Sequence, residues 1–506
     1  MSLSIALGNA LTGLRANSQL TNISSNNIAN AYTDGYTKKS ADTVSYTVGG
    51  SGRGVTIGTI QRQVNEMLIK DARTELGNTA YDNVRSSSYA NYIQALGKPE
   101  NSDNLSAMLT NLETKFQQLS DSPDSTTLQK EVLFASQSLT SDLKELNDTV
   151  RTVRENADAD IKREVDDLNN SLHRIKDLNS QIAKRFESGG DTVELLDQRD
   201  RLLNDISEKI PIKTIERDKG EVIILTTEGV PLLEGNVNEL EFSNSTYINA
   251  TDVYDPTGSM GTGYTNSLSG ITVNGVNITP NQNSYASISS GSIAGLFEVR
   301  DKDMVTVQKQ LDQIASGIID RFEDPVNDTS LTAGDPGLFT DNGAYHDRTD
   351  TDSIIGISGR IQVNDAVDPE KGGYLWRLRD GVGVAPVGIP PSSPFPASND
   401  EQILRFQTAF TDSLNFPNDT NLSNGMSLKS ATSELVGLQH SKNVTLNNTY
   451  ESQRLISDTA LSARDAEQGV NIDEELQNIL TYEKSYQANA QVMRTVSEMF
   501  DVLLSI

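Results

Sequence analysis

The chain has 506 residues, with 42 Lys and Arg against 70 Asp and Glu and a formal net charge of −28. This acidity argues against a nucleic-acid partner, which requires basic surface, and against anionic membranes. The sequence has no cysteine, which excludes disulfides and thiolate chemistry. No apolar run approaches the roughly 20 residues that span a bilayer, so we expect no membrane insertion.

The first predicted element is an amphipathic helix over residues 3–30. Seven of its positions follow the alternating four–three spacing of a coiled-coil seam: Leu7, Leu11, Leu14, Ser18, Thr21, Ser25 and Ile28. Three of the seven are small and polar. Because helices in proteins are stabilised mainly by tertiary packing, we expect this helix to need a partner.

The end of this helix has unusual composition. Asn26, Asn27 and Asn30 are side chains that compete with a helical backbone. Gly35, just before Tyr36, suits a turn with positive φ. These residues either mark a fraying helix end or make specific contacts in an assembly.

Helical periodicity then dominates as far as residue 210. Four helices are predicted, over residues 64–96, 104–119, 127–186 and 193–210. The third carries a continuous apolar stripe between charged residues. We expect a rod-like helical hairpin or bundle.

Pro211 begins a different pattern. Residues 212–287 are expected to form strands and turns, with a hairpin turn at Asn274-Gly275. A helix follows over residues 293–322. Residues 324–400 form a second β or irregular insertion with the only tryptophan, Trp376. Further helices are predicted over 401–410 and 427–465.

The last predicted helix extends from about residue 471 to about 504. Asn471 is a good N-cap, followed by three acidic residues at the positive end of the helix dipole. Its seam has the same four–three spacing, with polar breaks at Glu483 and Ser497. The seam positions are Ile472, Leu476, Ile479, Glu483, Tyr486, Ala490, Met493, Ser497, Phe500 and Leu504.

The two terminal helices are predicted to pair with each other. Residues 1–65 have five basic and two acidic residues, whereas residues 451–506 have four basic and ten acidic residues. Opposite charge and matching seams favour the pairing. We expect Leu7, Leu11, Leu14 and Ile28 to pack on Leu476, Ile479, Met493, Phe500 and Leu503.

The expected fold is mainly α with inserted β domains: an elongated, discontinuous α-helical core with paired terminal coiled-coil helices. Several domains are expected, because single cores rarely grow beyond about 250–300 residues. They are a terminal helical assembly domain (1–60 and 450–506), a rod-like helical core (61–211 with 290–323 and 401–449), an inserted β domain (212–289) and a second inserted β or irregular region (324–400).

The sequence offers no pattern for catalysis. His173, His346 and His440 lie far apart, without metal-ligand spacing. No dinucleotide-binding loop, phosphate-binding loop or nucleophile elbow is present. We therefore predict no catalytic, cofactor or metal site, and a protein that is not an enzyme.

Both ends of the chain carry motifs of one family. Residues 20–38, with Asn-Asn-Ile-Ala-Asn and Gly35-Tyr36, resemble the amino-terminal signature of bacterial flagellar axial proteins of the rod, hook and hook-associated type. Residues 469–504 resemble the carboxyl-terminal signature, through Gly-Val-Asn-Ile-Asp, Tyr-Gln-Ala-Asn-Ala and Met-Phe-Asp-Val-Leu-Leu. Asp34 replaces the usual proline and Lys38 the usual arginine, changes that keep the turn and the charge. The likeness is greatest to hook-associated members of the family.

The resemblance implies a structural protein that polymerises through its terminal helices to join hook and filament. It implies contacts with other copies, the hook protein, the second hook–filament junction protein and an export chaperone. It also implies type III export without a cleaved signal peptide, and an extracellular place on the flagellum. The implied assembly residues are Leu7, Leu11, Leu14, Asn26, Asn27, Ile28, Asn30, Gly35, Tyr36, Ile472, Leu476, Ile479, Tyr486, Met493, Phe500 and Leu503.

Three alternatives stay open on the sequence. The chain could be another flagellar axial protein, or a secreted cell-contact protein or effector with coiled-coil ends. It could also be an enzyme, such as a surface hydrolase, housed in the β insertions.

Overall fold

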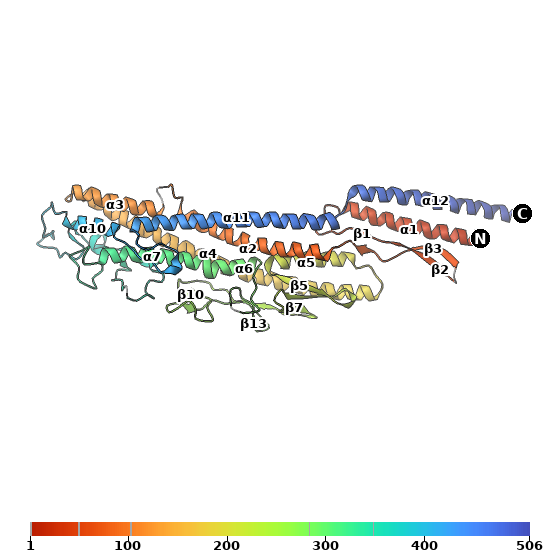
Figure 1. Ribbon diagram of the computed structural model, residues 1–506, viewed down its shortest axis with the longest axis horizontal. Helices are drawn as coiled ribbons and strands as arrows, with labels where there is room; N and C mark the ends of the chain where they lie inside the picture. Colours follow the sequence, from red (N-terminus) through yellow and green to blue (C-terminus); the bar gives the residue numbers. More distant parts are fainter. Residues whose placement is uncertain (1–2, 49–50, 102–103, 283, 348, 506) are drawn as a thin grey trace. The chain divides into compact units, whose positions relative to one another are not determined.

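The computed structural model describes residues 3–48, 51–101, 104–282, 284–347 and 349–505 (Figure 1). Its contacts divide the chain into two compact units. Unit 1 comprises Met1–Ala80, Asp167–Glu239 and Ser452–Ile506, and unit 2 comprises Tyr81–Asp166 and Leu240–Glu451. Both units are discontinuous in sequence. Three helices contribute residues to both: α2 (Glu66–Leu96), α4 (Thr126–Glu187) and α11 (Leu428–Gln468).

Unit 1 contains the two terminal helices, α1 (Leu3–Ala29) and α12 (Ile472–Leu504), which lie side by side and antiparallel (Figure 1). The predicted N-cap is confirmed, because the Asn471 side chain accepts hydrogen bonds from the backbone N–H groups of Asp473 and Glu474. Unit 1 also contains α5 (Val193–Lys209). The mainly α fold with paired terminal helices is as expected.

The segment after α1 forms short strands that the sequence did not reveal. They are β1 (Lys39–Ser40), β2 (Thr43–Val48), β3 (Ser51–Ile57) and β4 (Gln61–Arg62). β2 and β3 form an antiparallel hairpin with a register shift, and β1 pairs with β4. The hairpin packs on α1, where the backbone N–H of Val55 donates to Thr12 Oγ1 at 3.3 Å. Two glycines in β3 weaken the strand pattern, which explains the omission.

A four-stranded antiparallel meander completes unit 1. Its strands are β5 (Ile212–Glu216), β6 (Val222–Thr226), β7 (Pro231–Glu234) and β8 (Asn236–Val237). Asn179 of α4 donates to the Val222 carbonyl at 2.9 Å and accepts from Arg199 of α5 at 3.2 Å. These bonds fix the meander on the unit 1 helices. The residues predicted as one β domain, 212–289, are therefore divided between the two units; the four-domain division otherwise stays a prediction.

Unit 2 is built on an aromatic core. Its α-helices are α3 (Leu105–Asp121), α6 (Ser292–Glu298), α7 (Met304–Glu323), α8 (Ile357–Arg360), α9 (Arg377–Asp380) and α10 (Glu401–Thr411). A π-helical turn, η2 (Val299–Asp303), joins α6 to α7. Five buried phenylalanines from α3, α7, α10 and one strand pack together: Phe116, Phe322, Phe339, Phe406 and Phe410.

The strands of unit 2 are short. They are β9 (Leu240–Glu241), β10 (Asp252–Val253), β11 (Thr265–Asn266), β12 (Thr272–Val273), β13 (Val276–Asn277), β14 (Phe339–Asp341) and β15 (Ile361–Val363). The predicted hairpin turn is confirmed between β12 and β13, where Asn274 and Gly275 have φ of 49° and 76°. The second insertion has one described strand pair, β14–β15, and otherwise turns and short helices. The described residues of the two units also include the 3-10 turns η1 (Asp218–Gly220), η3 (Asp365–Val367), η4 (Pro369–Lys371) and η5 (Asn418–Thr420).

Two buried arginines fix the β9–β13 segment to the unit 2 helices. Arg154 of α4 donates to the carbonyls of Arg300 and Asn249, at 2.9 and 3.2 Å. Arg300 forms ion pairs with Asp158 and Asp301. Buried charges are stable only when they are paired and hydrogen-bonded. These bonds therefore favour a single position of the β9–β13 segment on the unit 2 helices.

Candidate assembly interface

The contact between α1 and α12 is displaced from the predicted seam. Every second seam position is near the interface: on α1, Leu14 is buried and Leu7 and Ile28 are half-buried. On α12 the corresponding positions are half-buried, except Tyr486, which is exposed. These half-buried residues are Ile472, Ile479, Met493 and Phe500.

Three residues that were predicted to pack between the helices are exposed instead, which corrects the predicted packing. Leu11, Leu476 and Leu503 are 41%, 48% and 58% exposed. Several buried residues lie one position before seam positions: on α1 these are Ala10, Asn17 and Ser24, and on α12 Glu475 and Val496. The apolar spacing could not show this, because much of the true inner face is polar.

Small and polar residues bring the two helices together. The Asn17 side chain donates to Ser485 Oγ at 2.9 Å. Gly13 lies under Asn489, and a methyl group there would come within 2.8 Å of the Asn489 side chain. The pair is therefore specified by fit and hydrogen bonds rather than by a wide apolar seam.

Asn27 explains the asparagines of the amino-terminal motif. Its side chain is fully buried, donates to the Lys39 carbonyl at 2.8 Å and accepts from the Lys39 backbone N–H at 3.1 Å. Tyr36 Oη donates to Asn27 Oδ1 at 2.9 Å. Asn27 thus fastens the end of α1 to the segment that follows. Asn26 is exposed, whereas half-buried Asn30 bonds back to the Asn26 carbonyl and accepts from Thr33.

The turn at Gly35 has a steric reason. Gly35 has φ of 67°, and a Cβ there would lie 2.6 Å from Arg201 Cγ on α5. Next to it, burial and then the charges of Glu194 and Asp197 raise the pKa of Tyr36 well above its usual value. Tyr36 therefore stays a neutral donor to Asn27.

A buried ionic cluster fixes β1 and β4 to α5. Lys39 pairs with Glu194 and Asp197, and Arg62 pairs with Asp197 at 3.0 Å and with Asp200. Burial disfavours the charge of Arg62, but Asp200 and Asp197 more than offset this and raise its pKa. No local sequence pattern pointed to these residues, since the partners are more than 130 positions apart.

Lys38 joins this segment to the break between α11 and α12. Its backbone N–H donates to the Gln468 carbonyl at 2.8 Å, and its Nζ lies 2.8 Å from Glu474 Oε1 and 3.9 Å from Glu475 Oε1. The motifs at the two ends of the chain therefore form a single structural joint, with α1 and α12 leaving it together.

The exposed surface of α12 includes many apolar side chains that nothing in this chain covers. They are Leu476, Leu480, Tyr486, Val492, Met499, Val502, Leu503 and Leu504. Of the 33 residues of α12, only Glu475 and Val496 are buried. Large apolar side chains exposed in this number indicate a surface that interacts with partners.

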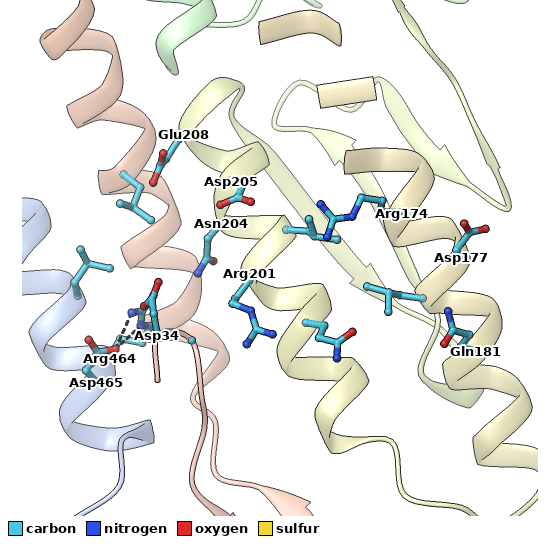
Figure 2. A pocket seen from close by; sticks show the side chains of 16 residues that line it. Asp34, Arg174, Asp177, Gln181, Arg201, Asn204, Asp205, Glu208, Arg464 and Asp465 are labelled. Atoms are coloured by element: carbon cyan, nitrogen blue, oxygen red, sulfur yellow. Dashed lines mark hydrogen bonds and ion pairs between the residues drawn. The ribbon is translucent and has the colours of Figure 1, made fainter. Parts of the chain in front are cut away.

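A cleft of about 840 Å³ lies beside the joint, among α2, α4, α5 and α11 (Figure 2). Figure 2 shows Asp34, Arg201 and Arg464 among its lining side chains, with Arg464 paired to Asp465 at 2.7 Å. Among the residues that the structure describes, no serine, threonine, cysteine, histidine, lysine or tyrosine lines the cleft. It offers carboxylates, amides and guanidinium groups to a partner.

No helix in the described part of the chain has the length and apolarity to cross a membrane. In the same residues, no group of three or more His, Cys, Asp or Glu could hold a metal ion.

The fold and the joint can now be compared with known proteins. Residues 90–337 match the family described as flagellar hook-associated protein FlgK helical domain, and residues 466–506 match the flagellar basal body rod FlgEFG protein C-terminal family. A solved structure, the flagellar hook junction protein FlgK from Burkholderia pseudomallei, has a similar fold. Its TM-score is 0.57 at 12% identity, over 78% of this chain and 99% of that one.

Two full-length relatives are named flagellar hook-associated protein 1. The Escherichia coli K12 protein is 22% identical over 100% of both chains, and the Bacillus subtilis 168 protein is 22% identical over 99% of this chain and 98% of its own. The paired terminal helices and the helical middle domain thus define a flagellar axial protein of the hook-associated class. This chain belongs to the flagellar hook-associated protein 1 family.

Proposed function

We propose that this protein polymerises through its terminal helices to form the junction between hook and filament. The observation that carries the proposal is the two-sided α1–α12 pair. Its inner face is closed by specific contacts, whereas the exposed surface of α12 leaves large apolar side chains in solvent. A surface of this kind is stable in a homopolymer, where neighbouring copies cover it.

The proposed mechanism couples folding to assembly. The inner face of the pair is narrow and polar, so a single copy gains little from ordering it. Fixing each backbone residue costs about 1–2 kcal/mol, which burial against neighbours offsets. The terminal segments are then disordered in the monomer and fold on incorporation. Repeated head-to-tail contacts generate a ring or a short helical segment.

Family membership supports a proposal for the partners and the location. We propose contacts with the hook protein on one side and the second hook–filament junction protein on the other, and an export chaperone before assembly. The protein would leave the cell by the type III route without a cleaved signal peptide and act outside it. Its role would be structural, without catalysis.

Truncation tests the junction role. Removal of the last 20 residues should leave a soluble protein that no longer enters the flagellum, so that filament subunits are lost to the medium. Immunogold labelling of isolated flagella should place the full-length protein at the hook–filament boundary. Normal filaments after truncation would contradict the proposal and favour a secreted cell-contact role.

Limited proteolysis tests the folding mechanism. In the purified monomer, the first 50 and last 50 residues should be cut well before the middle of the chain. If the ends resist protease as firmly as the middle, the terminal helices are already ordered and the coupled mechanism is wrong.

A further inference from the structure

A cavity of about 590 Å³ lies within unit 1, between α5, the start of α2 and the strands β4, β5 and β6. It shares no lining residue with the cleft in Figure 2. Three elements each contribute an arginine to its wall: Arg62 of β4, Arg73 of α2 and Arg199 of α5. Guanidinium groups gathered around one cavity are typical of sites that bind oxyanions.

Arg199 differs from the other two arginines because it forms no ion pair with any described residue. It is 5% exposed, so its guanidinium group is almost entirely out of water. Nη1 donates to Asn179 Oδ1 at 3.2 Å and to the Gly220 carbonyl at 2.5 Å. Nε and Nη2 have no hydrogen-bond partner among the described residues. Since a buried charge is stable only when it is paired, Arg199 requires a negative partner.

The charges buried around Arg199 do not balance. The cations of this cluster, each at most 11% exposed, are Lys39, Arg62, Arg73 and Arg199. Their carboxylate partners are Asp197, Asp200 and, on the surface, Glu194. The cluster therefore has one positive charge in excess, in a chain whose formal net charge is −28. Burial lowers the pKa of Arg199, and the charges of Asp200 and Glu216 only partly oppose this.

Two glutamates also line the cavity and are the competing partners for Arg199. Glu66 and Glu216 are exposed, and neither forms an ion pair among the described residues. An exposed carboxylate keeps its hydration, so it gains little by pairing. The wall also includes Gln61, Thr192 and Thr214, whose side chains are neutral hydrogen-bond donors.

We propose that this cavity binds a small tetrahedral oxyanion of the phosphate or sulfate class, with Arg199 as its main charged contact. Nε and Nη2 lie on one edge of the planar guanidinium group, and two parallel N–H groups match two oxygens of such an anion. The anion would compensate the excess positive charge of the cluster. It would also stabilise unit 1, because a ligand that binds only the folded state shifts the unfolding equilibrium. This site is independent of the proposed junction role.

Equilibrium dialysis of the purified chain against radiolabelled inorganic phosphate tests the site directly. We expect one phosphate bound per chain, displaced by sulfate but not by the same concentration of chloride. The melting temperature should rise over the same range of phosphate concentration. A chain that binds no phosphate would overturn the inference, and so would displacement by chloride as readily as by sulfate.

Substitution of Arg199 tests its role as the main contact. Arg199→Gln removes the charge and should weaken phosphate binding about tenfold or more. Arg174→Gln is the control, because Arg174 is an exposed arginine of unit 1 outside this cavity. Circular dichroism shows whether each variant folds. Equal phosphate affinity of the two folded variants would overturn the inference.

A counter-charge placed in the cavity tests the same claim with Arg199 intact. Thr214 is half-buried in the wall, so Thr214→Glu supplies a carboxylate from the chain itself. This variant should bind no phosphate, whereas Thr214→Val, of similar shape and without charge, should bind it. Phosphate and sulfate also stabilise proteins non-specifically, so the comparison is between these two variants in the same buffer. Equal phosphate binding by both would overturn the inference.

Glu216→Gln separates the oxyanion from the competing glutamate. We expect the original chain to bind phosphate and the variant to bind it a few times more tightly, because one repelling charge is removed. Phosphate binding by the variant alone would show that Glu216 is the partner of Arg199, and would overturn the inference.

Discussion

The phenylalanine core of unit 2 and the α1–α12 pair of unit 1 contrast sharply. In unit 2, Phe116, Phe322 and Phe406 have no exposed surface, and their ring centroids lie 5.5–6.2 Å apart. In the terminal pair, the contact includes glycine, asparagine and serine, and large apolar residues remain outside. The core of unit 2 buries its large apolar side chains within the chain, whereas the terminal pair leaves many of them exposed.

The difference indicates what each region does. A region that buries its own apolar surface is stable in one copy, because burial is the main favourable term in folding. A region that leaves apolar surface in solvent gains stability only on assembly. Mutations should therefore separate stability, which depends on unit 2, from incorporation, which depends on the terminal pair.

The largest expected effect on stability is in the phenylalanine core. Phe322→Ala should lower the free energy of unfolding of unit 2 by about 3–5 kcal/mol, because it removes a ring that packs on several others and leaves a cavity. Trp376, the only tryptophan, lies in unit 2, so its fluorescence during denaturation reports this unit. Phe134→Ala is the matched control, since Phe134 is 71% exposed. An equal loss of free energy of unfolding in Phe322→Ala and Phe134→Ala would contradict the role of the phenylalanine core.

A pH effect should also belong to unit 2. Asp312 is buried, and burial raises its pKa to about 6 despite hydrogen bonds from Ser358, Gly356 and Gln308. Its pKa in the folded state exceeds the value of about 3.9 in the unfolded state. Between these two pH values the folded state therefore binds more protons than the unfolded state. The contribution of Asp312 to the free energy of unfolding is complete below about pH 4. It is lost as the pH rises through about 6, a change of about 3 kcal/mol.

Asp312→Asn cannot titrate and should abolish that component. The free energy of unfolding should be measured by Trp376 fluorescence for the variant and for the original chain at pH 4 and at pH 7. The value for the variant minus the value for the original chain should be larger at pH 7 than at pH 4. A difference that is the same at both pH values would show that Asp312 titrates normally.

A smaller effect is expected at the joint between the two ends of the chain. Asn27→Ala leaves the Lys39 backbone groups buried without their partner, which costs about 1–3 kcal/mol. Amide hydrogen exchange of residues 36–40 should accelerate while the unit 2 core is unchanged. Asn26→Ala is the control, because Asn26 is exposed. Equal exchange in the two variants would contradict the role of Asn27.

Much of this arrangement could be predicted from sequence periodicity. The predicted helices 64–96, 127–186 and 427–465 correspond to α2, α4 and α11 within a few residues. In α4 the apolar stripe is long enough for helical spacing to be unambiguous. The Asn471 cap and the Asn274-Gly275 turn were also predictable, since both depend on local chemistry.

The details of the assembly surface were not predictable in the same way. A four–three apolar pattern does not reveal that Glu475 is buried and Leu476 is exposed. The Arg62–Asp197 pair joins residues far apart in sequence, and no local pattern reveals it. The β2–β3 hairpin was missed because Gly52 and Gly54 interrupt its alternation.

The smallest expected effect on the monomer is on the exposed surface of α12. Met499 and Leu503 are 52% and 58% exposed, so changing each to serine should alter the free energy of unfolding by about 0.5 kcal/mol or less. The same changes should prevent assembly if neighbours cover this surface. Met493→Ser, at a half-buried position of the same helix, is the control that should weaken the α1–α12 pair in the assembled protein.

The central claim is that the exposed surface of α12 serves assembly and not folding. The most direct test is to measure, for Met499→Ser with Leu503→Ser, both monomer unfolding and the amount of protein in isolated flagella. We predict monomer stability equal to that of the original chain and loss of the protein from flagella. Normal incorporation would contradict the claim, and so would a large loss of monomer stability.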